Sequence, residues 1–451
     1  HTFMLLMLII TRVVMRVLLL APRVTDGEST LPLGLAYIAA VLEADGCEVF
    51  GRDLSFTGPE DIAREATDLG VDAVLASSLT STLSQVAAAC DMVRCATGAP
   101  VALGGPHATA LPAHALDAGE FDAVMVGEGE DRVVPLVRAL VGNGRLARVP
   151  GLILSGGIST GPSPSPPDPD TLPYPRRGAF PEDLYSGMPA RGSYTPLVTS
   201  RGCGRRCAHC PSRSLVGGPR RRSPANVADE VEHLLSRGYR EFHVEDDGFA
   251  EDRGHVVGIC DAFRERGLDI DWACTNGLHP DDLDEGLLAA MAETGCYSIS
   301  LGIESLDRSV LATLCRPMDL ERIAGLVRAA HDHGMEVCGY FMLGLPGTVL
   351  NDGGPLADEA LALDLDTAHF SVFSPLPGSP IFSRLLADGA SVDELVAGRV
   401  PGMDRDTLDA ERARAYRRFY AGRKGVAVAR QALATGRPLE PLVKKFKGWF
   451  V

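Results

Sequence analysis

Three closely spaced cysteines are the residues of this chain best suited to chemistry. Cys203, Cys207 and Cys210 stand in the stretch Thr-Ser-Arg-Gly-Cys-Gly-Arg-Arg-Cys-Ala-His-Cys-Pro, directly after an apolar segment, 194–199, that we predict to be a strand. A four-iron, four-sulfur cluster takes one ligand per iron, normally a Cys thiolate. Three thiolates from one loop would therefore bind three irons and leave the fourth iron open to another ligand.

A zinc site is the alternative interpretation of this loop. Zinc takes four tetrahedral ligands, mostly Cys and His, so His209 or a distant residue would have to complete the set. No second cysteine pair stands at the spacing of a zinc ribbon. The spacing therefore favours the iron–sulfur cluster.

The segments around the cysteine loop predict a partial barrel of six βα units, shorter than the closed eight-unit form. Functional residues of such barrels project from the carboxyl ends of the strands. The predicted strands are 194–199, 241–245, 271–275, 298–302, 336–342 and 367–373, and the predicted helices are 226–237, 256–266, 281–294, 320–334 and 357–365.

An earlier region, 15–145, also alternates short apolar runs with segments of helical period. This pattern predicts a doubly wound parallel sheet that binds its ligand in loops at the carboxyl ends of the strands. Three loops, 76–82, 104–109 and 127–130, fall at such ends, and their glycines allow close backbone approach. The predicted strands are 17–21, 48–52, 73–77, 101–104 and 123–126, and the predicted helices are 33–44, 59–69, 83–96 and 131–141.

In this order, the motifs resemble those of the cobalamin (B12)-dependent radical S-adenosylmethionine (SAM) enzymes. The resemblance rests on Pro32-Leu-Gly-Leu-Ala-Tyr-Ile-Ala-Ala, Gly104-Gly-Pro-His-Ala-Thr and Val126-Gly-Glu-Gly-Glu, followed by the Cys-x3-Cys-x2-Cys loop. It covers roughly residues 15–385 and implies an α/β fold. A Rossmann-like cobalamin-binding domain would precede a partial (β/α)6 radical SAM barrel, and a small helical tail would follow.

The resemblance also implies three sets of site residues. The cluster ligands would be Cys203, Cys207 and Cys210. SAM would be bound at the strand ends of the barrel by Asp246, Asp247, Asn276, Ser300 and Glu304. Cobalamin would be bound by Ser77, Ser78, Thr80, Gly104, Gly105, Gly127, Glu128 and Gly129.

One departure concerns the lower face of cobalt. The Asp-x-His-x-x-Gly motif that provides an axial His in methionine-synthase-type domains is missing after the first predicted strand. His107 and His114 lie in other loops, and we interpret both as surface or loop residues. Cobalamin would therefore bind without an axial protein His.

The remaining regions set the domain boundaries. Residues 1–14 are expected to be an upstream or non-native extension, because the chain begins with His and Met15 precedes the first strand. Residues 15–145 form the cobalamin-binding-like domain, 146–193 a Pro/Gly-rich linker and 194–385 the radical SAM domain. Residues 386–451 form a helical C-terminal region that ends in Lys444-Lys-Phe-Lys-Gly-Trp-Phe.

The charge and the cysteine content indicate which binding partners and which compartment the protein can have. A formal charge of -16 over 451 residues argues against nonspecific binding to nucleic acid or to anionic membranes. The 11 cysteines are scattered outside the 203–210 loop, which favours a reducing compartment, hence the cytoplasm, over a disulfide framework.

The resemblance predicts a methyltransferase that uses a [4Fe-4S] cluster, SAM and cobalamin. By way of methylcobalamin, it would transfer a methyl group to an unactivated carbon, or a phosphinate phosphorus, of a small molecule or natural-product intermediate. Its electrons would come from an external donor such as a flavodoxin or ferredoxin. Two alternatives stay open: a radical SAM rearrangement or cyclisation enzyme, and a corrinoid and iron–sulfur binding or regulatory protein without turnover.

Overall fold

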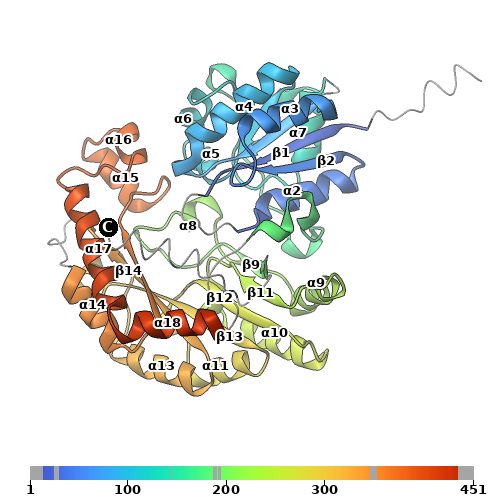
Figure 1. Cartoon of the computed structure of the whole chain (residues 1–451). Helices are drawn as coiled ribbons and strands as arrows, with labels where there is room; N and C mark the ends of the chain where they lie inside the picture. The colour runs from blue at the N-terminus through green and yellow to red at the C-terminus, as the bar shows by residue number, and fades with distance from the viewer. Residues whose placement is uncertain are drawn as a thin grey trace, which may run out of the picture. The chain divides into compact units, whose positions relative to one another are not determined.

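The computed structural model describes residues 14–24, 30–142, 144–185, 190, 194–345 and 353–434 (Figure 1). The rest of the predicted N-terminal extension and the cationic end at 444–450 lie outside the described residues. In the described part of the chain, no helix combines the length and the apolar character needed to cross a membrane.

The chain divides into two compact units. The N-terminal unit comprises residues up to Val24, Pro32–Pro167 and Leu172–Leu184, and the C-terminal unit comprises Thr25–Leu31, Asp168–Thr171 and Tyr185–Val451. The cysteine loop lies in the C-terminal unit, and the three predicted cobalamin loops lie in the N-terminal unit.

The N-terminal unit is built on a seven-stranded sheet of order β2-β1-β3-β4-β5-β6-β7. The first five strands are parallel, and the order changes direction between β1 and β3, which is the ligand-binding position of doubly wound folds. The strands are β1 Arg16–Ala21, β2 Glu48–Asp53, β3 Ala73–Ser77, β4 Val101–Gly104, β5 Ala123–Met125, β6 Leu152–Leu154 and β7 Ile158–Ser159.

Helices cover both faces of this sheet, as a buried parallel sheet requires. Alternate strand residues such as Leu18, Leu20 and Val74 belong to one buried cluster with α3 and α4, while α2 contacts α7. The helices are α2 Leu33–Ala44, α3 Pro59–Leu69, α4 Leu83–Thr97, α5 Pro106–Ala110, α6 Pro112–Asp117 and α7 Val133–Leu140. The predicted doubly wound architecture is confirmed.

The segment predicted as a linker, 146–193, differs from that expectation in its first part. β6 pairs antiparallel with β5, and β7 pairs with β6, so the sheet of the N-terminal unit continues into this segment. The buried Leu152 supplies an apolar side chain, and Gly156 and Gly157 at φ 77° and 75° form the turn between the two strands.

The C-terminal unit is a six-stranded parallel sheet of order β15-β14-β13-β12-β11-β8, which is the predicted open barrel (Figure 1). A two-stranded ribbon of β9 and β10 stands beside the cysteine loop. The strands are β8 Tyr194–Leu197, β9 Ser200–Arg201, β10 Arg220–Arg221, β11 Glu241–Val244, β12 Asp271–Leu278, β13 Cys296–Glu304, β14 Glu336–Leu343 and β15 Thr367–Val372.

Helices pack against the outer face of this barrel. Phe242 and Val244 of β11 join the outer apolar core, whereas Glu241 and His243, which alternate with them, face the inside. The helices are α8 Ser212–Leu215, α9 Pro224–Ser236, α10 Arg253–Glu265, α11 Glu285–Ala292, α12 Arg308–Thr313, α13 Leu320–Asp332, α14 Gly353–Ala362, α15 Pro380–Ala387, α16 Val392–Val396, α17 Arg405–Tyr420 and α18 Arg423–Ala434.

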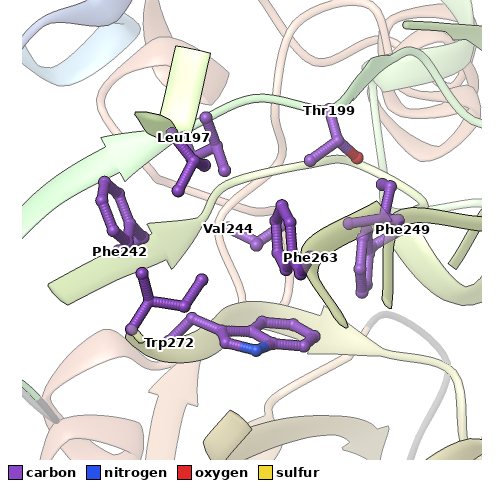
Figure 2. A pocket seen from close by; sticks show the side chains of 10 residues that line it. Leu197, Thr199, Phe242, Val244, Phe249, Phe263 and Trp272 are labelled. Carbon is purple, nitrogen blue, oxygen red and sulfur yellow. The ribbon is translucent and has the colours of Figure 1, made fainter. Parts of the chain in front are cut away.

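A small cavity lies in this outer core, between the first strands and α9 and α10 (Figure 2). Its walls include Phe242, Phe263 and Trp272, and Thr199 lies at its border. The space in which the centre of a water molecule could move is about 10 Å³, which is close to the minimum that holds one water. This packing gap is too small for an organic ligand.

Two tyrosines of α17 form hydrogen bonds with backbone groups along the outer edge of β15. The Tyr420 hydroxyl accepts from Ala368 N and donates to Ala368 O, both at 3.0 Å, and the Tyr416 hydroxyl accepts from Phe370 N at 3.1 Å. The two hydroxyls lie one helical turn apart and therefore match alternate residues of the strand. They supply the partners that an open sheet cannot provide at its last strand.

Tyr420→Phe should lower the free energy of unfolding by about 1–3 kcal/mol, because it leaves a buried N–H and C=O unpaired. Tyr416→Phe removes one hydrogen bond and should cost less. Urea titrations followed by circular dichroism measure both values. Equal stability of wild type and Tyr420→Phe would contradict this role of the hydroxyl.

Candidate functional site

The cysteine loop is held at the barrel mouth by backbone hydrogen bonds. It follows β8 and β9, so it starts from the carboxyl end of the first barrel strand. Ala208, between the second and third cysteines, donates from N to Leu314 O at 2.8 Å and accepts at O from Ile381 N at 2.9 Å. The loop is thereby fixed to the end of α12 and the start of α15.

The three thiols are free and sit in a partly buried setting. Cys207 is buried, and Cys203 and Cys210 are half-buried. Burial raises the pKa of the Cys203 and Cys210 thiols, while backbone N–H groups of Arg205 and Ser212 act in the opposite direction. In the described residues, no group of three or more His, Cys, Asp or Glu side chains converges on a single metal ion. A four-iron cluster does not need such convergence, because each thiolate binds a separate iron.

A buried arginine contacts the second thiol. Arg316 Nη1 lies 3.3 Å from Cys207 Sγ, and Nη2 donates to Gly302 O at 2.7 Å. The Arg316 residue is only 7% exposed. Nothing in the sequence pattern pointed to this residue, which lies 109 positions after Cys207.

Asp246 was predicted to contact SAM, and in the structure its carboxylate binds groups of the protein itself. Its Oδ1 accepts from Thr199 N at 2.7 Å, and its Oδ2 accepts from the hydroxyls of Thr199 and Ser200 at 2.5 and 2.6 Å. The side chain is buried, and this desolvation raises its pKa to about 6, against the opposing hydrogen bonds. The carboxyl group therefore fixes the segment that leads into the cysteine loop, and its contact with SAM stays a prediction.

Two further carboxylates hold the start of the loop. Asp247 Oδ2 accepts from Gly202 N at 3.1 Å, and Glu251 Oε2 accepts from Gly204 N at 2.8 Å. A Cβ at Gly204 would lie 2.1 Å from Glu251 Oε1, so the glycine lets this carboxylate approach the backbone closely. Glu251 is a loop-holding residue that the sequence analysis did not single out.

Of the other predicted SAM residues, Asn276 and Glu304 lie toward the carboxyl ends of neighbouring strands, whereas Ser300 lies in the middle of its strand. Asn276 is exposed on β12, and its Nδ2 donates to Asp246 O at 3.2 Å. Ser300 is buried on β13, and Glu304 is the last residue of that strand. The structure thus brings Asp246, Asn276 and Glu304 to the ends of adjacent strands.

Glu304 is held in an uncommon conformation. Its φ of 62° is left-handed, at a point where the register between β13 and β14 shifts. Non-glycine residues in that region carry strain and often mark functional sites. Glu304 Oε1 lies 3.8 Å from His209 Nε2, and burial raises the Glu304 pKa while Arg316 lowers it. Burial and Arg316 lower the His209 pKa to about 4, so this imidazole is neutral near pH 7.

The opposite end of the barrel interior is filled by a polar network. Tyr297 donates to Glu241 Oε1, His243 Nε2 lies 3.2 Å from the Tyr297 hydroxyl, and Tyr194 stacks on His243 at 4.1 Å between ring centroids. All four side chains are buried. They close the interior at the amino ends of the strands, so the loops at the other end remain the place for a ligand.

In the N-terminal unit, the three predicted cobalamin loops are tied together by two side chains. Thr109 Oγ1 donates to Gly105 O and accepts from Gly127 N, both at 3.0 Å, which joins the loops after β4 and β5. His107 Nδ1 lies 3.1 Å from Thr80 Oγ1, which joins the loops after β3 and β4. Neither Thr109 nor His107 was among the predicted site residues.

Gly105 and the serine loop after β3 approach each other very closely. Gly105 has φ 95°, and a Cβ there would lie 2.5 Å from Ser77 Oγ and 3.0 Å from Ser78 N. Ser78 is fully buried, and its hydroxyl finds no hydrogen-bond partner in the described residues. Gly104, the last residue of β4, leads into this contact.

A buried arginine shapes the third loop. Arg132 donates to Val126 O and Pro150 O, both at 3.1 Å, and also to Glu128 O. Gly127 takes φ 81°, and a Cβ at Gly129 would lie 2.8 Å from Met125 Sδ. One guanidinium therefore joins this loop to the segment that precedes β6.

The interpretation of His107 as a surface or loop residue needs correction. His107 lies in the short helix α5 and is 1% exposed, and its Nε2 lies 3.0 Å from His114 Nδ1. Both ring nitrogens of His107 thus have partners within the unit. A single polar residue in so short an element belongs to no periodic pattern that would reveal its burial.

His107 should make the N-terminal unit sensitive to acid. Burial, and then His114, lower its pKa from 6.5 to about 4. Between these two pH values the unfolded chain binds more protons than the native one, so stability present above pH 6.5 is lost as the pH falls toward 4. In His107→Gln, urea midpoints at pH 7 and pH 5 should lie closer together than in wild type. An unchanged pH dependence would contradict the assignment.

Comparison with known proteins assigns a separate family to each of the two units. Residues 22–137 match the family model of the B12 binding domain, and residues 197–359 match that of the radical SAM superfamily. The cytidylyl-2-hydroxyethylphosphonate methyltransferase of Streptomyces wedmorensis is 32% identical over 84% of this chain and 83% of its own length. The anaerobic magnesium-protoporphyrin IX monomethyl ester cyclase of Rubrivivax gelatinosus is 25% identical over 82% of this chain and 70% of its own.

Among solved structures, the radical SAM methyltransferase TsrM from Kitasatospora setae has the same fold. Its TM-score is 0.70 at 20% identity, with 84% of this chain and 76% of that chain covered. Three findings support the same family assignment. Both units have the predicted architecture, each matches a family model, and one relative is more than 30% identical over most of the chain. The chain belongs to the cobalamin-dependent radical SAM enzymes, in which a B12-binding domain precedes a radical SAM domain.

Proposed function

We propose that this protein is a cobalamin-dependent radical SAM methyltransferase that methylates an unactivated carbon of a small molecule. The observation that carries the proposal is the fixed three-cysteine loop at the mouth of the open barrel. It is supported by the 32% identity to a methyltransferase whose substrate is a cytidylylated phosphonate. We propose a substrate of the same broad class, a small polar biosynthetic intermediate.

The residues of the cysteine loop fit an iron–sulfur cluster. Three free thiols stand on one loop, and soft thiolate ligands suit iron–sulfur clusters. A Cβ at Gly248 would lie 3.3 Å from Cys203 Sγ, so the glycine leaves space beside the first sulfur. Arg316 offers a charged hydrogen-bond donor to the second sulfur. Cys203, Cys207 and Cys210 are therefore the proposed ligands.

The loops of the N-terminal unit fit a polar, extended ligand such as cobalamin. They lie at the carboxyl edge of the sheet, the first of them at the switch in strand order, and they contain the glycines Gly105 and Gly127 at positive φ. The buried Ser78 hydroxyl is an unused polar atom of this site. The predicted cobalamin contacts stay proposals, with His107, Thr109 and Arg132 as the side chains that hold the loops.

When bound, the cluster passes one electron to SAM and cobalamin carries the methyl group; in this mechanism the protein binds, orients and excludes water. Asp246 and Glu251 hold the cysteine loop in place, and Glu304 is the residue proposed to meet a polar part of SAM. The buried polar network at Glu241 closes the far end of the barrel. A flavodoxin or ferredoxin in the reducing cytoplasm is the proposed electron donor.

Anaerobic reconstitution of the full chain with iron, sulfide and hydroxocobalamin tests the proposal. We expect iron and corrinoid in the purified protein, and 5′-deoxyadenosine after reduction in the presence of SAM. With cytidylyl-2-hydroxyethylphosphonate as the first substrate probe, the product should gain one methyl group, labelled when SAM carries a deuterated methyl. A panel of related cytidylylated compounds follows as the second probe.

The alternatives give different products. The 25% identity to a cyclase makes rearrangement or cyclisation the second candidate, and 5′-deoxyadenosine with an unmethylated, isomeric or dehydrogenated product would establish it. Bound cofactors without any 5′-deoxyadenosine would favour a binding or regulatory protein. Protein without iron would refute the proposal altogether.

Glu304 and Asp246 should respond differently to replacement by Ala. Glu304→Ala should weaken SAM binding about tenfold or more, the value of one charge-assisted hydrogen bond, with little loss of stability. Asp246→Ala removes the acceptor of three hydrogen bonds and should lower the melting temperature markedly. SAM affinity and melting temperature are measured on both reconstituted variants. Unchanged SAM affinity in Glu304→Ala would remove this residue from the site.

A further inference from the structure

Arg316 is buried beside the cysteine loop although its guanidinium is permanently charged. Nη1 faces Cys207 Sγ at 3.3 Å, and Nη2 donates to Gly302 O at 2.7 Å, so one side chain joins the loop to β13. Its Nε has no hydrogen-bond partner in the described residues. The Glu304 carboxylate lies close enough for Arg316 to lower its pKa, but the described residues show no hydrogen bond between the two groups. Burying a cation is costly unless it is paired and hydrogen-bonded, and the thiol of Cys207 is the group that Nη1 meets.

The local backbone fixes the direction of this side chain. Cys315 takes φ 50° and ends α12, and Arg316 N donates back to Leu311 O at 2.9 Å. The preceding Leu314 O receives the hydrogen bond from Ala208 N in the middle of the cysteine loop. The helix end and the cysteine loop therefore move as one piece, and the guanidinium is held against the sulfur.

The other charged groups around the loop have different positions. The carboxylates of Asp247 and Glu251 bind backbone N–H groups of Gly202 and Gly204, on the side of Cys203. Arg205 is paired with Asp282. Among the described residues, Arg316 is the cationic side chain with a hydrogen bond to a thiol of the loop, and its charge opposes the negative charges of Asp247, Glu251 and Glu304.

We propose that Arg316 sets the reduction potential of the cluster held by the three cysteines, by donating a charge-assisted hydrogen bond to Cys207 Sγ. The inference rests on the proposed function, since it assumes that the loop binds the cluster. Reduction adds one electron, supplied by the external donor, to a group that is already rich in negative charge. A fixed cation and a hydrogen bond to sulfur stabilise the reduced form more than the oxidised form and raise the potential.

The test compares Arg316→Gln and Arg316→Lys in the reconstituted full chain without SAM. Midpoint potentials are read from redox titrations followed by electron paramagnetic resonance. Arg316→Gln should shift the equilibrium at least about tenfold toward the oxidised cluster, which corresponds to about 59 mV for one electron. Arg316→Lys keeps the charge but cannot span both acceptors, so its midpoint should fall between those of Arg316→Gln and wild type.

The matched control is Arg328→Gln, which removes the same charge from an exposed position on α13. Its midpoint should equal that of wild type. An Arg316→Gln variant with full iron and an unchanged midpoint overturns the inference. So does a variant in which only SAM affinity falls, since Arg316 would then serve SAM. If Arg316→Gln does not retain iron, an unchanged midpoint in Arg316→Lys overturns it. Wild type without iron refutes the proposed function instead.

Discussion

Replacing Cys203, Cys207 and Cys210 together with Ala is expected to remove iron from the reconstituted protein and to reduce SAM cleavage to background. The physical reason is that each thiolate supplies the ligand of a separate iron. The N-terminal unit has its own buried core and should remain folded. Iron and sulfide analysis, with 5′-deoxyadenosine formation, measures the loss.

Cys95→Ser is the matched control, because Cys95 is an exposed thiol of the N-terminal unit. This variant should keep its iron and its activity. The triple variant should still take up corrinoid, which shows that the loss is local. SAM cleavage by the triple variant would mean that the cysteine loop is not the cluster site.

Gly105→Ala is expected to weaken corrinoid binding about a hundredfold and to destabilise the N-terminal unit. Its φ of 95° and ψ of -176° belong to glycine, and the new Cβ would lie 2.5 Å from Ser77 Oγ. Strain of this kind costs about 1–3 kcal/mol, and the loops must separate to relieve it. Titration with hydroxocobalamin, followed by absorption, gives the affinity.

The control for this variant is Gly98→Ala in the same unit. Gly98 also has a positive φ, 72°, but a Cβ there meets nothing within 4 Å. It should cost stability through backbone strain and leave corrinoid affinity unchanged. If both variants bind corrinoid like wild type, the contact between the loops after β3 and β4 is not part of the cobalamin site.

Most of the fold could be predicted because alternation of strand and helix is a local property. The strands at 73–77 and 101–104 and the helices at 33–44 and 59–69 have the bounds that the sequence indicated. The barrel strands β12 and β13 run further than predicted, to Leu278 and Glu304. Both extensions lie where the register between neighbouring strands shifts, and such irregular pairing leaves no trace in hydrophobic periodicity.

The sequence motifs of the site could be predicted, whereas the side chains that hold those motifs in place could not. The cysteine spacing and the glycine turns are visible along the chain. Arg316, Thr109 and His107 act through partners far away in sequence or through burial, which only the fold reveals. The same holds for Asp246, whose position at a strand end suggested a ligand contact, while its carboxylate is already bound by Thr199 and Ser200.

The tyrosine pair of α17 has a consequence for the association of this protein with itself. A barrel of six strands is not closed, and its last strand would otherwise offer free N–H and C=O groups to a strand of another molecule. Tyr416 and Tyr420 occupy those groups at Phe370 and Ala368. A chain shortened before Arg405 should therefore expose these edge groups and aggregate more readily than the chain that retains α17.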